Sequence, residues 1–125
     1  MKPEALAAAK ALAKEVCAVD GDILFCAIVG GDAELVASAT KDGTSPRVPA
    51  GEVELFLKRW DLVRKIDDTG DSRLGPTRSA AVFRDGLTLV SVNLPDGACA
   101  LVGARPTFDP SKIRLLEKTA RSFKL

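Results

Sequence analysis

The chain has 125 residues, of which 46% are hydrophobic and 28% are charged, and this composition fits one globular domain with one core. Its 18 basic and 17 acidic residues leave a formal net charge of +1, and it contains no tyrosine and one tryptophan. Nucleic-acid binding without sequence preference depends on a basic field and on aromatic side chains that stack on bases. We therefore expect a single domain, 1–125, with no nucleic-acid partner.

The apolar segments are too short to cross a membrane, since a spanning helix needs about 20 apolar residues. Lys10 and Lys14 interrupt the apolar run at the N-terminus, which therefore predicts a helix and not a signal peptide. The odd number of cysteines argues against a secreted disulfide framework. Cys17, Cys26 and Cys99 stand among apolar neighbours, where cysteine is usually a small buried residue. We expect a cytoplasmic location and no membrane span.

The first half of the chain predicts a helix and a β-hairpin. Glu4–Cys17 is rich in Ala, Leu and Lys, which are strong helix formers. The continuous apolar run Ile23–Val29 predicts a strand buried on both faces. Gly30–Asp32 predicts a turn, and the alternating segment Glu34–Thr40 predicts the second strand of the hairpin. The polar segment Lys41–Pro49 contains a glycine and two prolines and predicts a loop.

The second predicted helix, Gly51–Ile66, carries two apolar stripes. Leu55 and Leu62, seven residues apart, lie on one face of the helix. A helix that packs on one sheet needs only one stripe, so the extra stripe indicates either a second contact or one wide buried face, and both interpretations stay open. Trp60 is expected in the core. The other stripe consists of Val53, Phe56, Leu57, Trp60 and Val63.

After a loop at Asp67–Pro76, the chain predicts three short strands and a last helix. Asp85-Gly86 and Asp96-Gly97 favour turns with positive φ, so they predict consecutive antiparallel hairpins. Asp109 is expected to cap the last helix, with Pro110 at its first position. The predicted strands are Arg78–Arg84, Leu87–Leu94 and Ala98–Ala104, and the apolar stripe of the helix is Ile113, Leu116, Ala120 and Phe123.

The element order is therefore α-β-β-α-β-β-β-α. It predicts an α/β fold of the α+β kind, in which three helices cover the apolar faces of a five-stranded antiparallel sheet.

The sequence offers no recognisable catalytic or cofactor signature. The absence of histidine removes the commonest general base and zinc ligand, and the cysteines form no CxxC pair. Gly30-Gly31 leads into a strand and not a helix, so it predicts a turn and not a phosphate site. Asp67, Asp68 and Asp71 cluster in a loop, but the closing glutamate of a calcium loop is missing. We expect a non-enzymatic protein without metal or cofactor.

Four segments carry a resemblance to a known family. They are the strand ILFCAIV (Ile23–Val29), the helix ELFLKRWDLVRK (Glu54–Lys65), LGPTRSAAVFRDGLTLVSVNL (Leu74–Leu94) and ALVGARPTFDPSKI (Ala100–Ile113). In these segments and in element order, the chain resembles the roadblock family, which has a profilin-like fold, and above all its small archaeal members. The loop Lys41–Pro49 has no clear equivalent in that family.

The resemblance implies a dimer, formed with a second copy or with a related roadblock-like chain, in which the second helices and middle strands meet. It also implies work as a scaffold or as a regulator of small Ras-like GTPases. By position, the interface residues would be Leu55, Arg59 and Leu62 on the helix, with Ala81 and Phe83 on the strand. The alternative is a small-molecule sensor of profilin-like or PAS-like architecture, which predicts an enclosed pocket between sheet and helix.

Overall fold

This computed structural model describes residues 3–32, 34–41, 55, 57–63, 65 and 74–122. Residues 55, 57–63 and 65 are helical and are called the second helix below. The predicted element order is confirmed, and each predicted strand agrees with the structure to within one residue at either end. The other elements are α1 (Pro3–Cys17), β1 (Ile23–Val29), β2 (Leu35–Thr40), β3 (Ser79–Phe83), β4 (Thr88–Asn93), β5 (Cys99–Ala104) and α3 (Ile113–Arg121), with 3-10 turns η3 (Pro95–Gly97) and η4 (Pro110–Lys112).

The five strands form one antiparallel sheet in the order β2-β1-β5-β4-β3. The last strand, β5, is inserted between β1 and β4, so the two hairpin groups of the chain become one sheet. Among the described strands, β3 pairs only with β4 and forms an edge of the sheet. Its outer backbone groups are therefore available to another strand.

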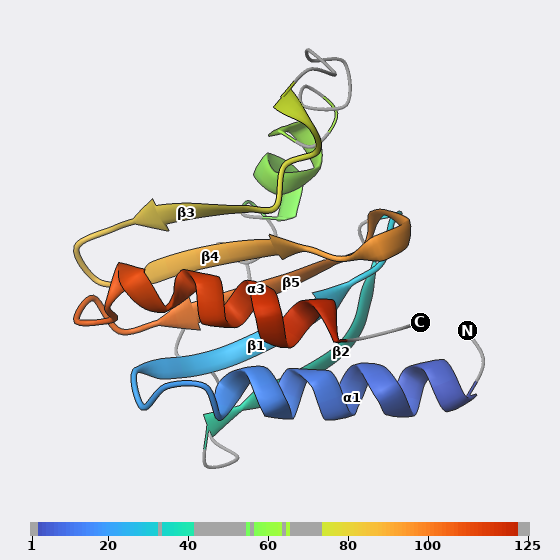
Figure 1. Ribbon diagram of the computed structural model, residues 1–125, viewed down its shortest axis with the longest axis horizontal. Coiled ribbons are helices and arrows are strands. Elements are labelled where there is room, and N and C mark those ends of the chain that lie inside the picture. The colour runs from blue at the N-terminus through green and yellow to red at the C-terminus, as the bar shows by residue number, and fades with distance from the viewer. Residues whose placement is uncertain are drawn as a thin grey trace.

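Helices α1 and α3 lie side by side on one face of the sheet (Figure 1). Alternate residues of the strands point to this face, where Ile28 of β1 and Val102 of β5 are at most 1% exposed. Leu12 and Val16 of α1 and Leu116 of α3 pack on them. This layer holds most of the buried apolar side chains and so forms the main core.

The second helix covers the opposite face. Trp60 packs there in a smaller cluster with Leu57, and Trp60 is only 6% exposed. The central strands are therefore buried on both faces, as the run ILFCAIV predicted, and Trp60 is a core residue, as expected. The sheet residues of this cluster are Ala27, Val29, Cys99 and Leu101.

Phe25 of β1 and Gly103 of β5 approach each other unusually closely on the same sheet. The two residues are paired across the strands, and a Cβ placed on Gly103 would lie 2.1 Å from Cε1 of the Phe25 ring. A side chain at position 103 would occupy the space that the ring fills. Glycine at this position therefore allows the aromatic ring to lie against the backbone of the neighbouring strand.

Both predicted hairpin turns of the last three strands form. Arg84 and Leu87 exchange backbone hydrogen bonds, with N···O distances of 3.0 and 3.4 Å, around Asp85-Gly86. Gly97 adopts the predicted positive φ of 77°, whereas Gly86 does not. Positive φ is thus used at one of the two Asp-Gly turns.

Asp109 caps the last helical segment, as predicted. Its Oδ1 accepts a hydrogen bond of 2.9 Å from the backbone N–H of Ser111, and this bond holds the pKa of the Asp109 carboxyl below its usual value. Pro110 begins the 3-10 turn η4, and α3 follows from Ile113. Among the other predicted features, residues 42–50, the acidic cluster at 67–71 and Phe123 lie outside the described residues.

A polar cluster joins the turn before β1 to the segment before α3. Lys112 Nζ donates to Asp20 Oδ1 over 2.5 Å, while Lys41 Nζ donates to the backbone oxygens of Asp20 and Gly21 over 3.0 and 2.6 Å. The hydrogen bond from Lys112 lowers the pKa of Asp20, and the same bond raises the pKa of Lys112. The cluster thus fixes the turn between α1 and β1 against the end of η4.

Candidate dimer interface

The second helix has two apolar faces, and only one of them meets the sheet. An α-helix turns about 100° per residue, so Leu57 and Trp60 share a face, and Leu55 and Leu62 share the opposite one. Trp60 is 6% exposed, whereas Leu55 is 67% and Leu62 is 60% exposed. The interpretation as one wide buried face is therefore wrong, because the second stripe points to solvent.

Arg59 lies between the two leucines on the exposed face of the second helix and is itself exposed. Two leucines one heptad apart form the kind of narrow seam that packs against another helix. Large exposed apolar side chains in a cluster commonly mark an interaction site. The three predicted helix residues, Leu55, Arg59 and Leu62, thus lie together on one surface.

The two predicted residues of β3 point to the other face of the sheet. Ala81 pairs with Val90 and Phe83 with Thr88, and Val90 belongs to the core under α1 and α3. Since side chains alternate along a strand, Ala81 and Phe83 face the α1–α3 side. Ala81 packs against that core, while Phe83 is 60% exposed. The structure therefore divides the five predicted residues between two faces.

Ala80 and Val82 are the β3 residues on the face of the second helix, and sequence reasoning missed them. Ala80 is exposed and Val82 is partly buried. A period-two reading of SAAVF separates these residues from Ala81 and Phe83. It does not tell which pair shares the face of the second helix, because that depends on the register of β3 against β4.

Asn93 connects the second helix to the segment that leads into β3. Its Oδ1 accepts a hydrogen bond of 3.4 Å from Trp60 Nε1, and its Nδ2 donates to the backbone oxygen of Thr77 over 2.8 Å. Its backbone N–H also donates to the oxygen of Arg78 over 2.8 Å. One side chain thus fixes the two elements of the candidate interface relative to each other.

Solved structures with the same arrangement of elements were found by structural comparison, whereas no protein-family model and no curated protein sequence matches the chain. A Roadblock/LC7 domain from Streptomyces avermitilis has a TM-score of 0.64 at 16% identity, covering 89% of this chain and 87% of its own. The chain has the roadblock fold. The fold expected from the resemblance is confirmed, and the likeness to archaeal members stays a prediction.

Two further structures with this fold carry more specific names. The gliding protein MglB from Thermus thermophilus has a TM-score of 0.73 at 13% identity and covers 96% of this chain and 87% of its own. MglC from Myxococcus xanthus has a TM-score of 0.64 at 15% identity and covers 92% and 98%, respectively. A further MglB structure is described as having a tetrameric arrangement.

Burial disfavours the reactive form of two cysteine thiols, one on α1 and one on β1. Cys17, Cys26 and Cys99 are buried, as predicted, and burial raises the pKa of Cys17 and Cys26. A thiol with a raised pKa stays protonated near neutral pH, and the thiolate is the reactive form.

The described residues include neither a cluster of metal ligands nor a helix that could span a membrane. In these parts of the chain, no group of three or more acidic or cysteine side chains is arranged to hold a metal ion. Over the same residues, no helix is both long and apolar enough for a membrane span.

Proposed function

We propose that the chain is a non-catalytic interaction module that dimerises through the second helix and β3, and that the dimer binds and regulates a small Ras-like GTPase in the cytoplasm. The observation that carries the proposal is the exposed face of the second helix. Leu55 and Leu62 are 67% and 60% exposed there, opposite the buried Trp60.

The leucines alone offset the cost of association only at the low end of its range. Fully burying a leucine contributes roughly 1.5–3 kcal/mol, and each of these side chains is about one-third buried already. Four leucines in a symmetric contact would then contribute roughly 4–8 kcal/mol, against an association cost of about 4–15 kcal/mol. A second contribution is needed, and the edge strand β3 supplies it.

Strand β3 offers a backbone edge that suits pairing with a second copy. In a two-fold symmetric dimer the same surface of each protomer is used, so β3 would pair antiparallel with β3 of the partner. Ala80 and Val82 would then extend the sheet surface under the second helices. Phe83, on the opposite face, would become more buried. The pairing adds backbone hydrogen bonds to the burial of the leucines.

The proposed partners follow from the fold and from the resemblance of the sequence. One MglB structure with this fold is described as tetrameric, which supports association of roadblock-fold chains. The resemblance to roadblock domains adds the small GTPase as a client of the dimer. The second chain is either another copy of this one or a related roadblock-like protein.

The oligomeric state tests the proposal directly. Light scattering should give wild-type particles of twice the 13.2 kDa chain mass, and Leu55→Glu should give folded monomers, because two carboxylates would be buried in the seam. Leu35→Glu is the matched control, since Leu35 is 62% exposed on β2 at the other edge of the sheet. It should remain a dimer. If Leu35→Glu dissociates to monomers as fully as Leu55→Glu does, the interface lies elsewhere.

The GTPase part has its own test. A small GTPase encoded beside this chain would be loaded with GDP or with a GTP analogue and titrated against wild type and Leu55→Glu. Binding that depends on the nucleotide and on the dimer supports regulation. If the GTPase binds in neither nucleotide state, the GTPase part of the proposal is refuted and the dimer part is unaffected.

The sensor alternative is not favoured by the described residues. It predicts an enclosed pocket between sheet and helix with a few convergent polar groups, whereas the hollow beside α3 is lined by five charged side chains.

A further inference from the structure

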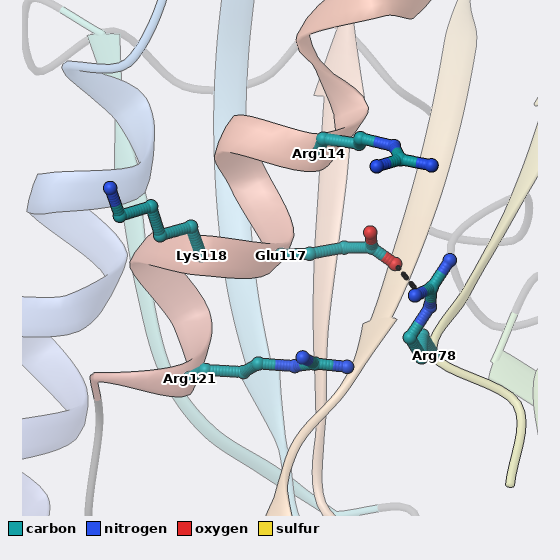
Figure 2. Close-up of a pocket in the computed structure, with 5 residues that line it drawn as sticks. All are labelled: Arg78, Arg114, Glu117, Lys118 and Arg121. Atoms are coloured by element: carbon teal, nitrogen blue, oxygen red, sulfur yellow. Dashed lines mark ion pairs between the residues drawn. The ribbon is translucent and has the colours of Figure 1, made fainter.

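Helix α3 and the residue before β3 enclose a hollow lined by basic side chains. The hollow has a volume of about 260 Å³ and is lined by Arg78, Arg114, Glu117, Lys118 and Arg121. Figure 2 shows that Arg114 and Arg121 project from α3 towards Arg78, with Glu117 between them, while Lys118 points to the other side of the helix. We call the three arginines with Glu117 the arginine hollow.

Glu117 neutralises only part of this charge. It is 8% exposed, and its Oε2 accepts a hydrogen bond of 2.9 Å from Ser79 Oγ and lies 3.5 Å from Arg78 Nε. One carboxylate therefore holds Arg78 in place and leaves that residue's two Nη groups for another acceptor. In the part of the chain that the structure describes, the side chains of Arg114 and Arg121 have no hydrogen-bond or ion-pair partner.

The stability of α3 does not explain all of these positions. A cation in the last turn of a helix interacts favourably with the helix dipole, and this accounts for Arg121. Arg114 lies in the first turn of α3, where the dipole disfavours a cation and where no acidic residue is present. Arg114 and Arg121 are seven residues apart, so they share a helix face and point at the same hollow.

We propose that the arginine hollow binds an acidic segment of a partner protein. Three guanidinium groups around one hollow suit carboxylates, which they bind through pairs of parallel hydrogen bonds. Clusters of arginine are a recurring means of recognising acidic motifs. The site goes beyond the proposed dimer contact, because all of its residues belong to one chain and lie on the α1–α3 side of the sheet.

The charge distribution favours a peptide over a nucleic acid. The basic surplus is local, since the whole chain has a formal net charge of only +1. A nucleic acid would need a basic surface that extends along several phosphates. A hollow of about 260 Å³ accepts one or two carboxylate side chains from a segment that crosses α3.

The experiment measures binding of a labelled peptide rich in glutamate by fluorescence anisotropy at low salt. The matched probe has glutamine in place of each glutamate, and a single-stranded oligonucleotide of equal charge is the third probe. The double variant Arg114→Glu/Arg121→Glu should weaken binding of the glutamate peptide by at least about tenfold. Lys10→Glu/Lys14→Glu is the control, because it changes the net charge equally on exposed positions of α1. It should leave the affinity within about twofold of wild type.

Each contrary result overturns the proposal. Equal binding of both peptides would show that carboxylates are not recognised, and equal weakening by the two double variants would show a response to net charge alone. Tighter binding of the oligonucleotide would assign the hollow to nucleic acid, and no binding of any probe would remove the site. Circular dichroism confirms that the variants are folded. Repeating the titration on Leu55→Glu separates peptide binding from dimerisation, because this variant is the one expected to be monomeric.

Discussion

The contact between Phe25 and Gly103 makes Gly103→Ala a sharp test of the packing. The added Cβ would lie 2.1, 2.4 and 2.7 Å from three atoms of the Phe25 ring, well inside any contact that a methyl group makes. Gly103 lies in the central strand β5, between Phe25 of β1 and Leu89 of β4. Phe25 is only 7% exposed, so the ring has little room in which to move away.

Two effects of opposite sign compete in this variant. Alanine in a strand interior is favoured over glycine by roughly 0.5–1 kcal/mol, so backbone propensity alone predicts stabilisation. Overpacking a filled core costs about 1–3 kcal/mol, and the short distances place this site in the upper part of that range. We expect a net loss of about 1–2 kcal/mol, which lowers the Tm by roughly 3–10 °C.

A double-mutant cycle separates the steric effect from other causes. Urea unfolding followed by circular dichroism would compare Gly103→Ala in wild type and in Phe25→Ala, which by itself costs about 3–5 kcal/mol. In the second background the methyl group enters vacated space, so the substitution should become neutral or stabilising. A Gly103→Ala variant as stable as wild type would refute the reasoning, and so would an equal loss in both backgrounds.

Two further predictions concern the Asp20–Lys112 pair and Trp60. The folded pKa of Asp20 lies below its ordinary 3.8, so the stability from the pair is present above that value and is lost as the pH falls through the folded pKa. The folded pKa of Lys112 lies above its ordinary 10.5, so on the alkaline side this stability is full below 10.5 and is lost as the pH rises through the folded pKa. Asp20→Asn should flatten both changes, as measured by urea midpoints across the pH range; a variant with the wild-type profile would contradict this. Trp60→Ala should cost about 3–5 kcal/mol, and the wild-type emission should be blue-shifted until unfolding, whereas red-shifted native emission would show that Trp60 is not buried.

The strands could be predicted because their signals are local. A continuous apolar run marks Ile23–Val29, and Asp-Gly pairs separate the last three strands, so each boundary depends on neighbouring residues only. The cap at Asp109 is equally local. The fold then followed from element order, since a sheet of five antiparallel strands with three helices has few compact arrangements.

The features that the sequence did not reveal depend on contacts between distant residues. The face to which Ala81 and Phe83 point is set by the register of β3 against β4, and a shift of one residue would reverse it. Asn93 meets Trp60 across 33 positions of the chain, and Ser79 meets Glu117 across 38. No periodicity within one element reports such pairs, so the Asn93 link and the arginine hollow appear only in the folded chain.

The two proposed surfaces use different sides of the same sheet, and this has a consequence for assembly. The second helix covers one face of the sheet, and its exposed leucines point away from the sheet. Helix α3 lies on the opposite face, where it presents Arg114 and Arg121. On these two proposals, one chain would hold a second copy and an acidic segment at once. Arg78 directly precedes β3, so pairing of β3 with its symmetry mate would bring the two arginine hollows to either side of the shared edge. An acidic partner that spans both would bind the dimer more tightly than the monomer without any new contact.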